Sequence, residues 1–107
     1  MLEDAFRNRK SDFQIQEQGI VTKLLTDDLE GSRHQRFILT VDSGQTLLIA
    51  HNIDIASRVD KLAEGDRLSF YGEYEWNEQG GIIHWTHHDP HKNHPDGWIE
   101  HQGKKYT

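Results

Sequence analysis

The sequence has no cysteine, and its 107 residues include only two prolines and one methionine. Without cysteine the chain cannot form disulfides, iron–sulfur clusters or thiolate zinc sites. It also lacks any apolar run near the roughly 18 residues that a membrane-spanning helix requires. The hydrophobic fraction is only 34%, but these residues fall in periodic runs, which favours one folded domain with a polar surface over a disordered chain.

Basic residues are also in short supply. Lysine and arginine total 12 against 18 aspartates and glutamates, and the net charge is −6 when the eight histidines are neutral. An acidic chain repels nucleic acid at long range, which argues against general binding of polyanions. Because histidine titrates near neutrality, we expect the surface charge to depend on pH between about 5 and 7.

The hydrophobic pattern predicts a mainly β fold. Apolar residues alternate with polar ones in several short runs, and Gly-containing turns separate these runs. The expected strands are 18–25, 36–41, 46–50, 68–76 and 82–88, with a further short strand at 98–101. Residues 2–10 favour a short helix. The segment 54–63 also favours a helix, because Ile55, Val59 and Leu62 would share one face.

Three strands, a short helix and two more strands follow the order of the OB-fold, a five-stranded Greek-key barrel. A small sandwich or an SH3-like barrel is the rival, and the helix between the third and fourth strands decides against both. We therefore expect a single domain, 1–107. Its parts would be a helical extension over 1–17, an OB-like barrel over 18–90 and an irregular tail over 91–107 packed on the barrel.

Long stretches of the chain resemble a bacterial family called domain of unknown function 3465. The resemblance rests on GSRHQRFIL (31–39), GQTLLIAHNIDIASRV (44–59), GDRLSFYGEYEWNEQGGIIHWTHHDP (65–90) and HPDGWIEHQGKKY (94–106). It implies an OB-like barrel and no known activity. Many members carry an N-terminal leader, whereas MLEDAFRNRK has no apolar core. The resemblance thus implies a periplasmic or secreted protein if a leader was removed, and otherwise a cytoplasmic one.

Five of the eight histidines lie within residues 84–94. On a strand, His84 and His88 would share one face, and a loop residue, Asp89, His91 or His94, could complete a metal site. Imidazole with carboxylate suits zinc or another divalent transition metal. The spacing matches no standard zinc signature. Two alternatives remain: the histidines fix the tail through ordinary hydrogen bonds, or they form a pH-responsive patch.

A second group of polar residues flanks the second and third strands, the usual binding surface of an OB-fold. Two arginines there could hold a phosphate or carboxylate bidentately, and an outward tyrosine could stack on a base or a sugar. The candidate ligand-binding residues are Arg33, His34, Arg36, His51, Asn52 and Tyr71. The alternative is that the arginines pair with the acidic loop 27–30 and that the tyrosine is merely half-exposed.

Glu73 and Glu75 share the outward face of one strand. If the hairpin after them brings them near His84 or His88, Glu73 could act as the general base of a metal site. The alternative is that these glutamates protect a strand edge from aggregation.

Two functions follow. The favoured one is a non-enzymatic OB-like binding module for an oligosaccharide, a single-stranded nucleic acid or a protein partner. The other is a metal-dependent, phosphodiesterase-like hydrolase that uses His84, His88 and His94. An accessory domain that docks through 80–98 is a further alternative. None of these interpretations requires a cofactor other than the metal.

Overall fold

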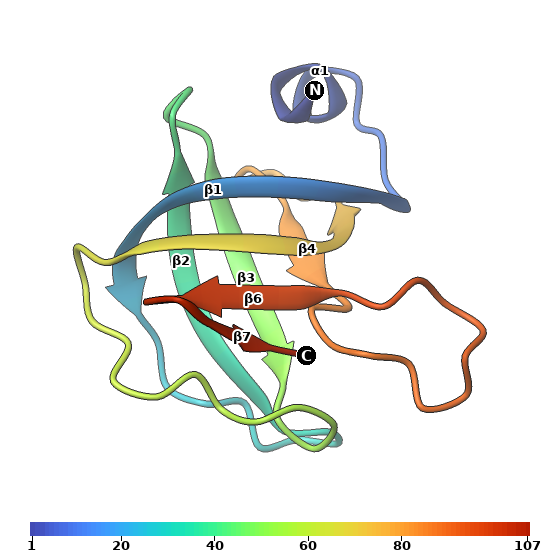
Figure 1. Ribbon diagram of the computed structural model, residues 1–107. Helices are drawn as coiled ribbons and strands as arrows, with labels where there is room; N and C mark the ends of the chain where they lie inside the picture. The colour runs from blue at the N-terminus through green and yellow to red at the C-terminus, as the bar shows by residue number, and fades with distance from the viewer.

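The computed structural model describes the whole chain, residues 1–107, as a barrel with one short helix (Figure 1). The sheet order is β1-β2-β3-β5-β4-β6-β7, and β1 also pairs with β4, which closes the first five strands into a barrel. The elements are α1 (Leu2–Arg7), β1 (Phe13–Leu24), β2 (His34–Val41), β3 (Thr46–Asn52), β4 (Arg67–Glu75), β5 (Ile82–His84), β6 (Trp98–His101) and β7 (Lys104–Tyr106).

The strand pairing confirms the OB-like barrel. β3 and β5 run parallel, and the other neighbouring strands run antiparallel. β1 pairs with β4 through its first part and with β2 from Gly19 onward. The chain passes so close to β2 at this point that a Cβ on Gly19 would overlap the carbonyl oxygen of Thr40. β1 already begins at Phe13, ahead of the expected start at Gln18.

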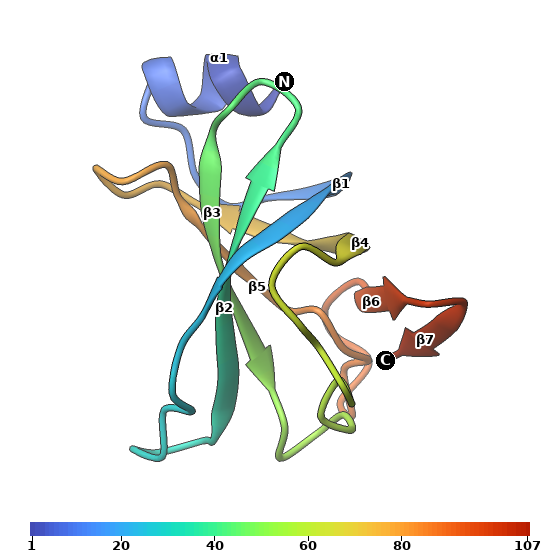
Figure 2. The same cartoon turned by 90° about the vertical axis from the view of Figure 1, so that its left-hand side faces the viewer.

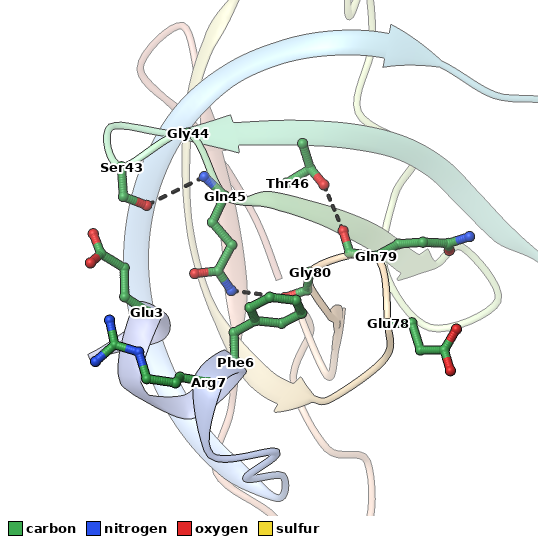
Figure 3. Close-up of a pocket in the computed structure, with 10 residues that line it drawn as sticks. All are labelled: Glu3, Phe6, Arg7, Ser43, Gly44, Gln45, Thr46, Glu78, Gln79 and Gly80. Carbon is green, nitrogen blue, oxygen red and sulfur yellow. Dashed lines mark hydrogen bonds between the residues drawn. The ribbon is translucent and has the colours of Figure 1, made fainter.

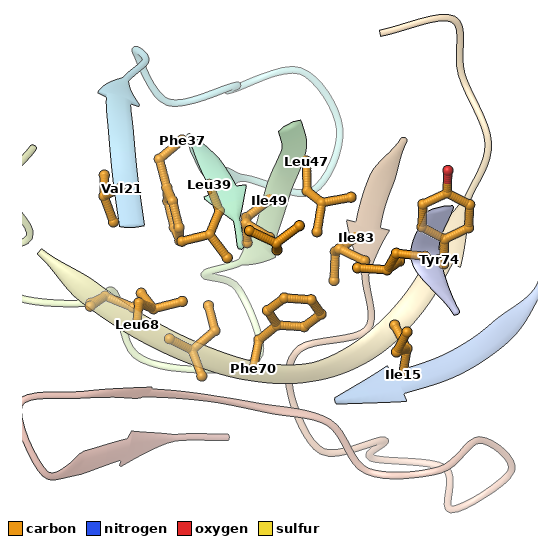
Figure 4. Close-up of a cluster of buried hydrophobic side chains, with 14 of the residues drawn as sticks. Ile15, Val21, Phe37, Leu39, Leu47, Ile49, Leu68, Phe70, Tyr74 and Ile83 are labelled. Carbon is orange, nitrogen blue, oxygen red and sulfur yellow. The ribbon is translucent and has the colours of Figure 1, made fainter. Parts of the chain in front are cut away.

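The core lies inside the barrel and follows from the alternating pattern of the strands. Along β2, β3 and β4, each fully buried residue lies between partly or fully exposed ones, as expected for strands with one face on a core. The inward side chains interlock in Figure 4, and they include Phe37, Leu39, Leu47, Ile49, Leu68, Phe70, Tyr74 and Ile83. Outward-facing positions on the same strands are therefore free to carry polar side chains.

The helix predicted over 54–63 is wrong, because this segment forms turns. Gln35, buried on β2, holds Val59 through both of its backbone groups: Val59 N donates to Gln35 Oε1 at 2.8 Å, and Gln35 Nε2 donates to the Val59 carbonyl at 3.1 Å. Lys61 adopts a left-handed backbone conformation, with φ of 56°, which a helix does not allow. Val59 and Leu62 nevertheless cover this end of the core.

The N-terminal helix is present but shorter than predicted. It lies at the end of the barrel opposite the 54–63 segment (Figure 2). Leu2 and Ala5 are buried against the core. The indole nitrogen of Trp76 donates to the Phe6 carbonyl at 2.9 Å, and the two rings stack with centroids 6.3 Å apart. This helix is not long and apolar enough to cross a membrane.

The last barrel strand is shorter than predicted, because β5 ends at His84 instead of continuing to His88. Trp85 has a left-handed φ of 56°, which breaks the strand and turns the chain out of the sheet. Residues 85–97 then form an irregular loop, the 85–97 loop (orange in Figure 1). The tail is not wholly irregular: the strand suggested at 98–101 is present, and β6 pairs with β4 where β5 has left it.

Candidate functional site

The outer face of the barrel carries a hollow of about 280 Å³ between β3 on one side and β4 and β5 on the other, which we call the outer groove. Its residues are His34, Ala50, Asn52, Ile55, Glu73, Glu75, His84, Trp85 and His87. The register explains this grouping. Glu73 lies opposite His84 across β4 and β5, and Asn52 lies opposite His34 across β3 and β2. The small side chain of Ala50 leaves room between these pairs.

Each of the two glutamates in the groove pairs with a histidine. His84 Nε2 lies 3.1 Å from Glu75 Oε2, and His94 Nε2 lies 2.9 Å from Glu73 Oε1. The first pair is open to solvent, whereas His94 and Glu73 are only 19% and 26% exposed. Charge interactions are stronger away from water, so the His94–Glu73 pair is the firmer of the two.

Both nitrogens of the His94 ring face acceptors. Nε2 donates to Glu73 Oε1, and Nδ1 donates to the Pro95 carbonyl at 2.9 Å. A neutral imidazole carries only one N–H, so only the protonated ring satisfies both bonds. Burial lowers the pKa of His94, but the bonds to Glu73 and Pro95 and the charges of Glu73 and Asp89 together raise it above 6.5.

Hydrogen bonds within the 85–97 loop hold His94 against Trp85 and Glu73 at the edge of the groove. The Asp89 carboxylate accepts the backbone N–H groups of His91, Asn93 and His94 at 2.9–3.0 Å. The first of these bonds is the main reason that the pKa of Asp89 lies below its usual value. At the end of the loop, Gly97 N donates to the His87 carbonyl at 2.8 Å.

The loop thus folds back onto β4 and β5, and His94 also covers Trp85. Their rings are stacked, with centroids 3.9 Å apart and planes inclined by 12°. The ring of His87 lies 5.2 Å from the same indole. Burial lowers the pKa of His87, which keeps this second histidine neutral beside the cationic His94.

His51, predicted to bind ligand, instead points into the barrel and is fully buried. Its Nε2 donates to the Ser57 carbonyl at 2.9 Å, and its Nδ1 accepts the hydroxyl of Thr86 at 2.8 Å. Burial lowers its pKa to about 4. The neutral side chain therefore links β3 to Ser57 and Thr86 through hydrogen bonds. Neither ring nitrogen is left to bind a ligand.

The other predicted ligand-binding residues divide into two groups. His34 and Asn52 line the outer groove and stay candidates. The two arginines are engaged elsewhere: Arg33 pairs with Asp54 at 2.7 Å, and Arg36 donates to the Thr26 carbonyl through Nε and Nη2. Tyr71 faces outward beside Trp98, with ring centroids 6.4 Å apart, and does not line the groove.

The predicted metal ligands do not come together as one set. No group of three or more histidine, aspartate or glutamate side chains is arranged to hold a metal ion. His84 and His94 face different glutamates, and both carboxylate oxygens of Asp89 accept backbone N–H groups of its own loop. His88 lies beyond the end of β5, so it does not share the strand face of His84 as predicted.

The hairpin predicted from the sequence placed Glu73 and Glu75 near His84, and this is where they lie. The sequence did not predict that Trp85 lines the groove. A strand through 82–88 would have put Trp85 on the face opposite His84, and the left-handed backbone at Trp85 places both in the groove wall. A β-propensity pattern gives no signal for such a break, because aromatic residues favour strands. Ile55 was missed because it was assigned to a helix.

A larger hollow of about 520 Å³ lies between α1 and the turns that join β2 to β3 and β4 to β5 (Figure 3). Its polar side chains mainly tie these turns together. Gln45 Nε2 donates to the Gly80 carbonyl and Thr46 Oγ1 donates to the Gln79 carbonyl, both at 2.8 Å. It holds no histidine, so the outer groove, with its titratable groups and tryptophan, is the stronger candidate site.

Residues 1–107, the whole chain, match a family model described as "Protein of unknown function (DUF3465)". No curated protein and no solved structure matches the chain.

Proposed function

The chain belongs to this family of unknown function, and from its geometry we propose that the barrel is a binding module whose outer groove takes one ring of an oligosaccharide. The observation that carries the proposal is the set of groups around Trp85. Carboxylates, imidazoles and the Asn52 amide line the hollow beside its indole. Such planar polar groups bond paired hydroxyls, and an aromatic face packs against the C–H groups of a sugar ring.

The charges favour a neutral or cationic ligand over a single-stranded nucleic acid. Glu73 and Glu75 would repel phosphates in the groove. The two candidate arginines are engaged elsewhere: Arg33 pairs with Asp54, and Arg36 donates to the Thr26 carbonyl. The net charge of −6 acts in the same direction at long range. Of the three ligand classes that the sequence suggests, an oligosaccharide therefore fits the groove best.

The size of the groove also suits a sugar. Small-molecule sites usually enclose about 300–1,000 Å³, and the groove, at about 280 Å³, holds a single ring with neighbouring rings outside. OB-folds bind oligosaccharides on this face of the barrel. A metal-dependent hydrolase would need a ligand set that the structure does not assemble, so binding without turnover is the function that the geometry supports best.

A titration with neutral oligosaccharides tests the proposal. Chitin, cellulose and starch fragments are added in turn to ¹⁵N-labelled protein at pH 6, and the indole N–H signal of Trp85 is followed. We expect one class of fragment to move this signal saturably. Ala50→Phe, which fills the floor of the groove, should abolish the shift. Gln18→Phe introduces the same side chain at an exposed outward position of β1 and should leave the shift intact.

The proposal fails if no neutral fragment moves the Trp85 signal, or if binding survives Ala50→Phe. Thermal unfolding of both variants checks that the barrel is intact, because an aromatic side chain is well tolerated on an outward strand position.

A further inference from the structure

His94 lies against two residues that line the outer groove, Trp85 and Glu73. Its ring stacks on Trp85 at 3.9 Å, while Nε2 donates to Glu73 at 2.9 Å. Because its two nitrogens both face acceptors, the ring is an imidazolium. The chain itself therefore supplies a planar cation that lies on the tryptophan face and pairs with the carboxylate.

The groups around the two glutamates contain no permanent cation. The lining of the groove includes no lysine or arginine. The residue opposite Glu73 on β1 is Gln14, and the residue opposite it on β5 is His84. The ion-pair partners of Glu73 and Glu75 are thus histidines, His94 and His84. His34 and His87 complete the titratable lining, and Asp89 acts on His94 from within its own loop.

We infer that the groove selects a sugar ring that carries a protonated amino group, with the ring stacked on Trp85 and the ammonium replacing His94 on Glu73. The inference rests on the proposed function, since it names the kind of sugar. A cation over an indole and beside a carboxylate combines two favourable interactions. A hydrogen bond to a charged group is stronger than one between neutral groups, so the amino sugar should bind about tenfold tighter than its neutral counterpart, or more.

The loop can keep its backbone hydrogen bonds to Asp89 during this exchange. The backbone N–H of His94 is held by Asp89, so the imidazole can rotate away while the loop keeps its other bonds. The His94 side chain acts as a competitor for the site. Removing it with His94→Ala should increase the affinity for the amino sugar severalfold, because Trp85 and Glu73 would both be free.

The test compares two tetrasaccharides of the same linkage at pH 6, one of glucosamine and one of N-acetylglucosamine. They differ in charge and share the ring. Calorimetric titration should show about tenfold tighter binding of the charged one. Glu73→Gln should remove this preference, so that the two tetramers bind that variant with equal affinity. Glu100→Gln, on the exposed outward side of β6, is the matched control and should leave both affinities as they are.

The outcomes separate the two proposals. If both tetramers bind in the groove with equal affinity, or if Glu73→Gln weakens both equally, the preference for an amino sugar is overturned and the binding module stands. If neither tetramer nor any neutral fragment moves the Trp85 signal, the proposed function fails and the inference fails with it. If the N-acetylated tetramer binds tighter, the inference is also overturned.

Discussion

The imidazole of His94 lies almost parallel to the indole of Trp85, although Trp85 begins the 85–97 loop and His94 lies near its end. The contact joins the two ends of the 85–97 loop and links three features that would otherwise be separate. These are the histidine-rich stretch, the glutamates of β4 and the broken end of β5. Because the contact includes a titratable ring bonded to Glu73, the closed loop should respond to pH.

The first prediction concerns the protonation of His94. Its NMR titration midpoint should lie above the ordinary histidine value of about 6.5, because the bonds to Glu73 and Pro95 and nearby negative charge outweigh its burial and raise the pKa. A raised pKa stabilises the fold below pH 6.5, and this stabilisation is lost as pH rises through the pKa of the folded state. Glu73→Gln should lower the midpoint. An unchanged midpoint in that variant would contradict the pairing.

The second prediction concerns His51, whose pKa shift has the opposite sign. Burial lowers its pKa from 6.5 to about 4. As pH falls between these values, His51 therefore binds a proton in the unfolded chain before it does so in the folded one. The contribution of His51 to stability should therefore fall by about 3 kcal/mol as pH drops from about 6.5 to about 4. Urea unfolding at several pH values measures this loss. His51→Gln removes the titrating group and should reduce this loss by about the same amount, even if it lowers stability throughout.

The third prediction concerns Gly97, where the chain returns to the barrel. A Cβ at this position would overlap the carbonyl oxygens of Trp85 and Tyr71. Gly97→Ala should therefore destabilise the fold by about 1–3 kcal/mol, as overpacking usually does, and should shift the His94 signals. Asn93→Ala, at an exposed position of the same loop, is the control and should have little effect. Equal stability of the two variants would refute the close approach.

The fourth prediction concerns Gln35, which replaces the helical hydrogen bonds of the 54–63 segment. Gln35→Met keeps the size of the side chain but leaves the N–H and C=O of Val59 without partners. Each buried unpaired group costs about 1–3 kcal/mol, so the loss should exceed about 2 kcal/mol. Amide exchange at Val59 should also become much faster. Gln18→Met, on the exposed face of β1, should change neither quantity.

Much of the barrel follows from the sequence, because the pattern that defines a strand is local. Alternation along 36–41, 46–50 and 68–76 identifies three strands and the faces they bury, and these faces form the core. The turn NEQGG also fixes which strands become neighbours. A hairpin at this turn predicts that Glu73 and Glu75 lie close to His84. In the structure, Glu73 is the residue opposite His84 on the neighbouring strand.

The parts that the sequence did not determine depend on partners far away along the chain. The 54–63 segment has a helical pattern, but Gln35 and His51 capture its backbone from neighbouring strands. The same holds for the histidines. Their number and chemistry are evident from the sequence, whereas the tertiary structure decides that His51 is a buried neutral tie and that His94 returns to Glu73. Periodicity predicts which face of an element a residue occupies. Which residues of other elements contact that face is decided only when the barrel closes.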